Sequence, residues 1–201
     1  MFRIATALIF LSPAIAPAEC LTPASLDTGI TVEYGNGNIS HIQRQPDGSI
    51  LDAFSDTDSY YKETIIFTSV DGVIENHWKV FPEDSWEARS ATGKTYDFTP
   101  ESQPDYAANA SASGTVTWSE NDYYSGSKTF SWFGYESEPV IVGECSYDAV
   151  RIFTYEFSIT GENFFIREVK FLPELGIGVQ LGNSYFNWSS DNAVIVSMTA
   201  S

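Results

Sequence analysis

The sequence predicts an all-β protein: a curved antiparallel meander of about ten to twelve strands, forming a half-open barrel with one short helix. Three observations predict it. Short β-prone runs alternate with turn residues along the chain, only one segment has the start and stop signals of a helix, and the C-terminal runs carry apolar residues on both faces. A β-sandwich, whose strands each show one polar face, is the alternative.

The first strands are separated by turn sequences. The segments GNG (35–37), PDG (46–48) and DG (71–72) interrupt runs of alternating apolar and polar residues, which is typical of hairpins. The expected strands are 30–34, 38–44, 49–54, 62–69 and 73–81. These segments therefore predict a three-stranded meander followed by a hairpin.

A short helix is expected over 82–93 (PEDSWEARSATG), because acidic residues lie in its first turn and Gly93 ends it. Residues 97–113 are rich in proline and small residues and predict a long loop. Strands then resume at 114–119, 128–133, 139–143, 147–158, 162–172, 176–181 and 192–199.

The first 18 residues have the features of a secretory signal. Arg3 precedes an apolar run over residues 4–11, and Ala16-Pro17-Ala18 supplies small residues for cleavage after Ala18. The mature chain, residues 19–201, is long enough for one β domain with a substantial core. We therefore expect a periplasmic or secreted protein, with no segment long enough to span a membrane.

The chain is strongly acidic. Because the signal carries Arg3, the mature chain has nine basic and 27 acidic residues, a net charge of −18. This charge excludes nucleic acid and anionic membranes as expected partners, since both would be repelled. Solubility is the simplest role of the acidic residues.

The two cysteines, Cys20 and Cys145, predict a disulfide. An exported protein enters an oxidising compartment, and the chain offers no other thiol partner. Such a bond would tie the mature N-terminus to a strand in the last third of the fold. In the chain-entropy model, closing so long a loop stabilises a protein by about 4 to 5 kcal/mol.

Several fragments resemble catalytic motifs without their context. Residues 88–95 (ARSATGKT) match a phosphate-cradling loop except for the first glycine, and the expected helix precedes the motif instead of following it. Residues 125–128 (SGSK) and 190–192 (SDN) lack the third element of the serine β-lactamase set. His41 and His77 have no nucleophile motif beside them, so we expect surface histidines and no enzymatic activity.

No cofactor or metal is predicted. Two histidines and two cysteines expected to be oxidised leave no transition-metal ligand set. Asp52, Asp56 and Asp58 lack the glycine and the final glutamate of a calcium loop, so turn carboxylates are the favoured interpretation.

Aromatic residues are the one feature of the composition that favours a ligand. Most of them are expected in the core, because strands select aromatic side chains. Those on the C-terminal strands would point into the hollow of a curved sheet and bind an apolar ligand. The predicted lining residues are Trp118, Trp132, Phe153, Tyr155 and Phe171.

The segment from Val140 to Leu181 resembles a known group of proteins. The runs VIVGECSYDAVRIFTYEF and REVKFLPELGIGVQL, with FLPELG at 171–176, and the upstream GITVEYGNGNISHIQRQPDGSILDAF are similar to blocks of uncharacterised exported proteobacterial proteins related to the unclosed β-barrel superfamily of the outer-membrane lipoprotein carriers. The resemblance implies a curved sheet with an apolar concave face in the periplasm. The carriers cover that face with helices, and this chain offers only one, so lipoprotein carriage itself is not implied.

These observations lead to one leading hypothesis and two alternatives. The leading hypothesis is a non-enzymatic periplasmic or secreted protein that binds an apolar small molecule or an envelope protein in a concave sheet. A carbohydrate-binding β-sandwich, with exposed coplanar rings, is the first alternative. A glycosidase-like hydrolase, with two carboxylates facing each other across a cleft, is the second.

Overall fold

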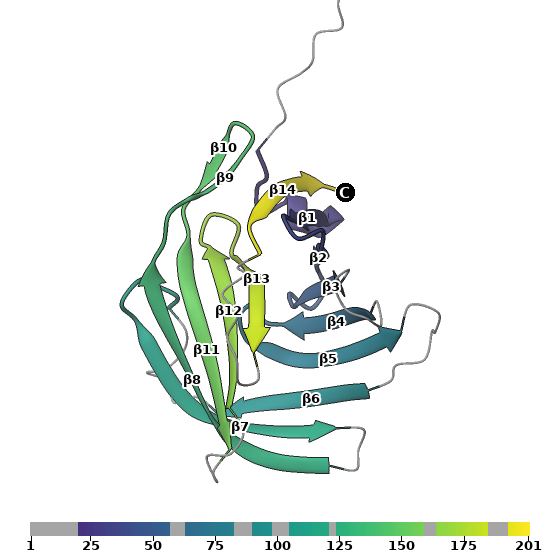
Figure 1. The fold of residues 1–201 in the computed structure, drawn as a ribbon, viewed down its shortest axis with the longest axis vertical. Helices are drawn as coiled ribbons and strands as arrows, with labels where there is room; N and C mark the ends of the chain where they lie inside the picture. Colours follow the sequence, from purple (N-terminus) through teal and green to yellow (C-terminus); the bar gives the residue numbers. More distant parts are fainter. Residues whose placement is uncertain are drawn as a thin grey trace, which may run out of the picture.

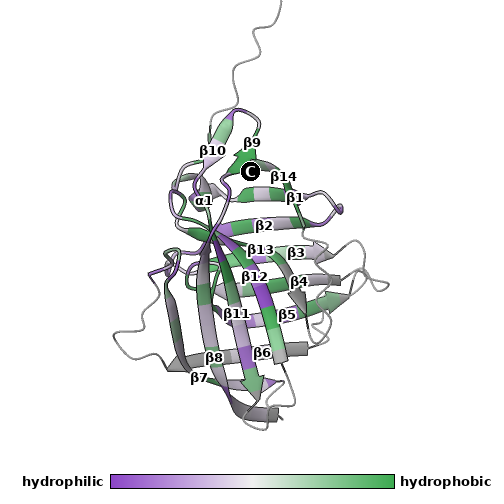
Figure 2. Cartoon of the chain, turned by 60° about the vertical axis from the view of Figure 1, so that its left-hand side comes forward, coloured by the Kyte–Doolittle hydropathy of each residue, from purple (hydrophilic) through white to green (hydrophobic). Residues whose placement is uncertain are grey.

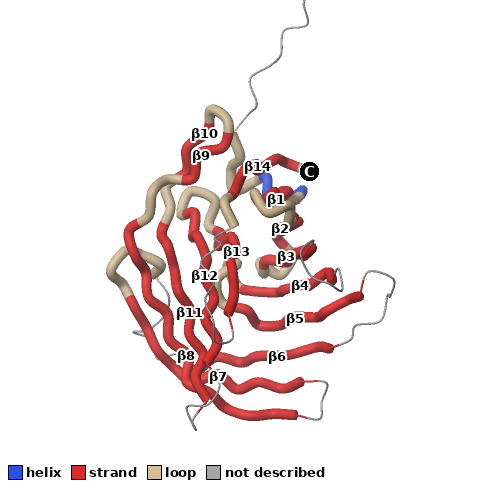
Figure 3. Tube along the Cα trace, viewed as in Figure 1, coloured by secondary structure: helices blue, strands red, loops and turns tan. Residues whose placement is uncertain are grey.

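The computed structural model describes residues 20–56, 63–82, 90–97, 105–120, 124–158, 164–184 and 193–201. Almost all of the regular structure in these ranges is β-strand (Figure 3). The predicted signal peptide, residues 1–18, lies outside them. Within these ranges, no helix is long and apolar enough to cross a membrane.

The described ranges contain one helix, α1 (Ser25–Thr28), and 14 strands. The strands are β1 (Ile30–Tyr34), β2 (Ile39–Arg44), β3 (Ile50–Asp56), β4 (Glu63–Ser69), β5 (Glu75–Pro82), β6 (Ser90–Asp97), β7 (Ser111–Glu120), β8 (Tyr124–Glu136), β9 (Val140–Val142), β10 (Cys145–Tyr147), β11 (Val150–Ser158), β12 (Phe164–Leu172), β13 (Ile177–Ser184) and β14 (Ile195–Ala200).

Twelve strands form one antiparallel sheet, which confirms the predicted fold class (Figure 1). The order is β13-β12-β11-β8-β7-β6-β5-β4-β3-β2-β1-β14, so the sheet has two ends and is not closed. Two strands, β9 and β10, form a separate hairpin, and β11 pairs with β8 across this insertion. The sandwich alternative is not observed, since the large strands belong to a single sheet.

The helix expected over 82–93 is wrong at both of its ends. Pro82 ends β5, and Ser90 to Gly93 belong to β6, which pairs with β5 on one side and β7 on the other. Residues 83–89 lie outside the described residues. The helix found among the described residues is α1. The loop expected over 97–113 is also shortened, because β7 begins at Ser111.

The sheet curls until its two ends approach each other. In Figure 1, β13 lies across β4 and β5, with β14 above it. The backbone N–H of Gly178, on β13, donates to the carbonyl of Asp71 in the β4–β5 turn at 2.7 Å. The curl therefore satisfies an amide on the edge strand β13 that would otherwise be free.

Both faces of β13 are covered as a result. Gly178 packs on Gly72 and Val73 on the inner face of the curl, where Val73 belongs to a core cluster with Phe130, Trp132, Ile152 and Val169. Ile177, Val179 and Leu181 point to the other face and belong to a second cluster with residues of β1, β2 and β14. This double burial explains the apolar residues on both sides of β13.

The predicted disulfide is confirmed. Cys20 and Cys145 are bonded, with their Cα atoms 5.5 Å apart, and join the N-terminal segment to β10. The backbone N–H of Leu21 also donates to the hydroxyl of Tyr147 at 2.7 Å. These contacts hold the β9–β10 hairpin against the second cluster, the one with Ile177 and Val179, to which Leu21, Cys145 and Tyr147 also belong.

Replacing Gly72 with alanine should destabilise the protein strongly. Its φ is +79°, and an added Cβ would lie 2.3 Å from the backbone oxygen of Gly178. We expect the free energy of unfolding, measured by urea denaturation, to fall by about 3 kcal/mol or more, from left-handed strain plus overpacking. Gly48→Ala is the matched control, because Gly48 has φ +87° with nothing within 4 Å of the added Cβ. It should cost only about 1 to 2 kcal/mol; equal losses in the two variants would contradict the close approach of β13.

Candidate binding site

Two of the predicted lining residues are part of the packed inner face. Trp132 on β8 is only 1% exposed. The ring of Tyr106 packs between Trp132 and Phe171, with ring centroids 5.3 and 4.9 Å away. Trp132 and Phe171 therefore fill this part of the hollow and do not line an open cavity there.

Trp118 lies further along the inner face and is half-buried. Its indole covers Gly126 on the neighbouring strand β8, and the ammonium group of Lys128 lies 5.3 Å from the ring centroid. Lys128 also pairs with Glu156 on β11 at 3.2 Å. The inner face thus becomes polar beyond Trp132.

A buried ion pair links the inner faces of the two halves of the curl. Arg167 on β12 contacts Glu75 on β5 at 2.8 Å, and their side chains are 4% and 6% exposed. The Arg167 guanidinium also donates to the carbonyls of Gly72 and Val73 at 3.1 Å each. It lies over the Phe67 ring, 5.5 Å from the centroid. Arg167 therefore fixes the β4–β5 turn against β12.

Asp52 lies close to this ion pair on the inner face. Burial raises the pKa of Asp52 from 3.8 to about 6, while its hydrogen bond with Ser40 and the charge of Arg167 oppose the shift. Ser40 also accepts a hydrogen bond from the Tyr34 hydroxyl at 3.4 Å, and burial raises the pKa of Tyr34. Asp52 is thus an interior carboxyl, not a turn carboxylate as expected; Asp58 and the Asp56 side chain lie outside the described residues.

The other two predicted residues, Phe153 and Tyr155, lie on the opposite face of the sheet from Trp132 and Phe171. The β11 register pairs Phe153 with Phe133 and Tyr155 with Ser131, whereas Thr154 pairs with Trp132. The five predicted residues therefore do not form one lining. The register brings Phe153 and Tyr155 together with three rings that the sequence did not single out.

We call this group the outer aromatic face: Phe133, Tyr135, Phe153, Tyr155 and Phe157. Rings on β8 meet rings on β11 edge to face, with Phe133 5.6 Å from Tyr155 and Tyr135 5.7 Å from Phe153. Along β11, Tyr155 and Phe157 are parallel within 7° at 6.2 Å. The face is solvent-accessible, since Phe133 and Tyr135 are 41% and 47% exposed.

Rows of hydroxyl groups lie beside these rings. Every outward-facing residue of β7, and every outward-facing residue of β8 before Phe133, is a serine or threonine. They pair across the two strands, Ser113 with Ser131 and Thr115 with Thr129, and Thr129 in turn neighbours Phe157 on β11. We call these nine residues the hydroxyl rows: Ser111, Ser113, Thr115, Thr117, Ser119, Ser125, Ser127, Thr129 and Ser131.

This outer surface is almost uncharged. Of the 15 outward-facing residues on β7, β8 and β11, nine carry hydroxyl groups, five are the aromatic residues and one, Arg151, is charged. Protein surfaces are ordinarily about a quarter to a third charged residues. Figure 2 brings β8 and β11 to the front of the molecule. This composition contrasts with the strong acidity of the whole chain.

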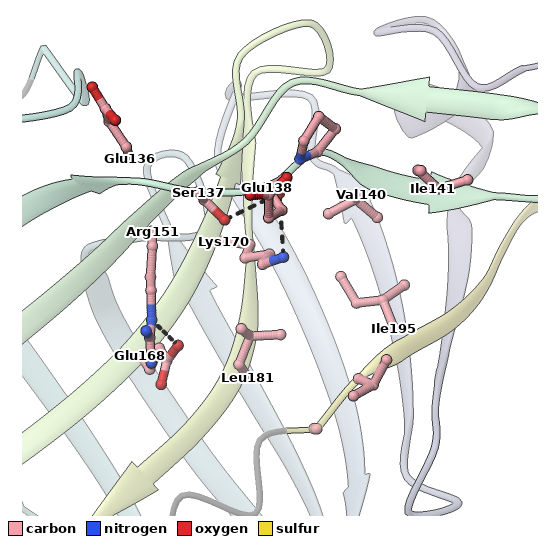
Figure 4. A pocket seen from close by; sticks show the side chains of 13 residues that line it. Glu136, Ser137, Glu138, Val140, Ile141, Arg151, Glu168, Lys170, Leu181 and Ile195 are labelled. Atoms are coloured by element: carbon pink, nitrogen blue, oxygen red, sulfur yellow. Dashed lines mark hydrogen bonds and ion pairs between the residues drawn. The ribbon is translucent and has the colours of Figure 1, made fainter.

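A pocket of about 640 Å³ (Figure 4) adjoins the outer aromatic face at Arg151. The Arg151 guanidinium lies 4.7 Å from the centroid of the Phe153 ring. We call this cavity the outer pocket. It lies between β12 and β13 on one side and β9 and β14 on the other. Its lining residues are Glu136, Ser137, Glu138, Pro139, Val140, Ile141, Arg151, Glu168, Lys170, Leu181, Ala193, Val194 and Ile195.

Among the described residues, the fragments that resemble catalytic motifs lack the local structure that those motifs need. Ser90 to Thr95 form part of strand β6, whereas a phosphate-cradling motif needs a loop before a helix. His77 is partly buried, and desolvation lowers its pKa. Among the described residues, no group of three or more histidine, cysteine or carboxylate side chains could hold a metal ion.

Comparison with protein-family models, characterised proteins and solved structures finds no match to this chain. The fold and the outer surface therefore define the class: an open, single-sheet all-β protein with an uncharged aromatic and hydroxyl face. The resemblance to the unclosed β-barrel superfamily stays a prediction.

Asp52 generates a prediction about pH. Between about pH 4 and 6 the unfolded carboxyl ionises while folded Asp52 keeps its proton, so its contribution to stability falls as pH rises and levels off above the folded pKa. Asp52→Asn removes this loss. The difference in unfolding free energy, variant minus native, should grow by about 1 to 3 kcal/mol from pH 4 to pH 7.

Asp47→Asn is the control for that measurement. Asp47 accepts hydrogen bonds from Ser49, which lower its pKa, so its contribution to stability is present at neutral pH and lost as pH falls. The difference in unfolding free energy, Asp47→Asn minus native, should therefore not increase from pH 4 to pH 7. An Asp52→Asn difference independent of pH would contradict the burial of an ionisable carboxyl at this position.

Proposed function

We propose that this chain is an exported, non-enzymatic protein that binds a linear, uncharged polysaccharide on the outer surface of β7, β8 and β11. The observation that carries the proposal is the uncharged strip in which the outer aromatic face lies beside the hydroxyl rows. Aromatic rings stack on the apolar C–H faces of sugar rings, and serine and threonine hydroxyls both donate and accept hydrogen bonds. A neutral polyhydroxyl chain uses both the stacking and the hydrogen bonds, and its binding requires no charged side chain.

The arrangement of the rings favours an extended ligand. Phe153, Tyr155 and Phe157 follow one another along β11 with centroids 6.4 and 6.2 Å apart, and the second pair is parallel. Rows of hydroxyl groups run alongside on β8 and β7 because cross-strand partners share a face. Such parallel rows fit successive units of a chain better than one compact molecule.

An apolar ligand within the concavity, the leading expectation from the sequence, stays a prediction. Trp132 and Phe171 pack into the core together with Tyr106. Six of the seven large hydrophobic residues that are most exposed among the described residues lie on the outer aromatic face, β9 or the β14 segment. Exposed apolar groups of this kind mark interaction surfaces, and they favour the outer surface over the hollow.

Affinity electrophoresis of the mature chain, residues 19–201, in gels containing laminarin, xylan or dextran tests the proposal. We expect retardation by at least one of these uncharged polysaccharides and none by anionic alginate, which the acidic chain repels. Affinity should change little between roughly 50 and 500 mM salt, since no ion pair is involved. Tyr155→Ala and Phe157→Ala should each weaken binding about tenfold, or about 1.4 kcal/mol.

Ile141→Ala is the matched control, because Ile141 is also a large hydrophobic residue, 69% exposed, but lies on β9, outside the proposed surface. It should leave retardation unchanged. Migration that no uncharged polysaccharide retards would refute the proposal, as would equal losses in Ile141→Ala and Tyr155→Ala. Circular dichroism of each variant separates a loss of binding from a loss of folding.

A further inference from the structure

We infer that the outer pocket is a binding site for a primary ammonium group carried on an apolar body, separate from the proposed polysaccharide surface. The inference rests on Glu168, which lines the pocket on β12. Its side chain is only 2% exposed. One carboxylate oxygen, Oε1, accepts a hydrogen bond from Arg151, whereas Oε2 is buried without a hydrogen-bond partner.

A buried carboxylate oxygen without a donor is costly, so a ligand that supplies an N–H group gains more here than at an exposed carboxylate. Three carboxylates line the pocket, Glu136, Glu138 and Glu168, against two cations, Arg151 and Lys170. The whole chain adds a strongly negative potential. These charges favour a cationic ligand group over an anionic one.

The two cations of the pocket are already engaged. The Arg151 guanidinium bonds Glu168 and lies over the Phe153 ring. The Lys170 ammonium lies 3.5 Å from the carbonyl oxygen of Glu138 (Figure 4), and burial lowers the Lys170 pKa. The polar atom of this pocket that is buried without a hydrogen-bond partner is therefore an acceptor, Oε2 of Glu168.

The other lining residues indicate what kind of body the ligand carries. Val140 and Ile141 from β9, Leu181 from β13 and the 193–195 segment form an apolar wall facing the charged side of the pocket (Figure 4). An alkyl chain buries its methylene groups against such a wall, at about 0.8 kcal/mol for each buried CH₂. The pocket therefore selects an alkylammonium group and disfavours a hydrophilic amine.

Titration of the ¹⁵N-labelled mature chain with hexylammonium, hexanol and hexanoate, which share one alkyl chain, tests this inference by NMR. Hexylammonium should produce saturable shifts at the amides of Ile141, Glu168 and Ile195, with a Kd at least tenfold below that of hexanol. Hexanoate should bind most weakly. Glu168→Gln should weaken hexylammonium binding fivefold or more, because it removes the acceptor's charge and keeps its shape.

Glu144→Gln is the matched control, since Glu144 is exposed in the β9–β10 turn and does not line the pocket; its Kd should equal that of the native chain. If Glu168→Gln fails to fold, two measurements still test the inference. They are hexylammonium binding by Glu138→Gln, which changes an exposed carboxylate of the pocket, and the order of affinities of the three probes for the native chain. Equal affinities for hexylammonium and hexanol, tighter hexanoate or shifts away from the pocket would each overturn the inference. None of these results depends on polysaccharide binding, which the electrophoresis tests separately.

Discussion

The Arg167 guanidinium is the contact on which the arrangement of this sheet depends. It binds Glu75 and two carbonyls of the β4–β5 turn, and so holds the C-terminal strands within the curl of the N-terminal ones. A buried ion pair adds little net stability, but removing one partner leaves an uncompensated charge that costs about 3 to 5 kcal/mol. The main effect of the Arg167–Glu75 pair is on the arrangement: it places β12 and β13 against the β4–β5 turn. Gly72 and Gly178 then allow the two backbones to touch.

This arrangement separates the roles of the two faces. Described ionisable groups of the inner face, such as Arg167, Glu75 and Glu156, are paired across strands and buried with the core. The outer surface of β7, β8 and β11 has almost no charge, although the chain as a whole is strongly acidic. In the proposed function, binding at that surface relies on rings and hydroxyl groups. The outer pocket lies beyond Arg151, where the uncharged surface ends and carboxylates begin.

Local patterns predicted much of the fold, because turn residues and alternation act within a few residues. They gave the β class, most strand positions and the two-sided apolar pattern around Phe153. Which strands become neighbours depends on distant contacts: β11 pairs with β8 across a hairpin, and only this register brings Phe133 beside Tyr155. The C-terminal part of the helix expected over 82–93 failed because Ser90 to Gly93 pair with β5 in the ladder. α1 spans four residues, too few for a periodic signal. The disulfide was predictable because the expected export signal and the presence of two cysteines both favour it.

Hydrogen exchange at the Gly178 amide tests directly whether β13 is held within the curl. Gly178 lies on the last strand of the sheet, where an amide facing outward would exchange within minutes, as at fraying edges. Because it donates to Asp71 against the inner core, we expect its exchange to be as slow as that of the Ile152 amide, limited by global unfolding. Fast exchange at Gly178 with slow exchange at Ile152 would contradict the curled arrangement, and with it the separation of a packed inner face from an exposed outer one.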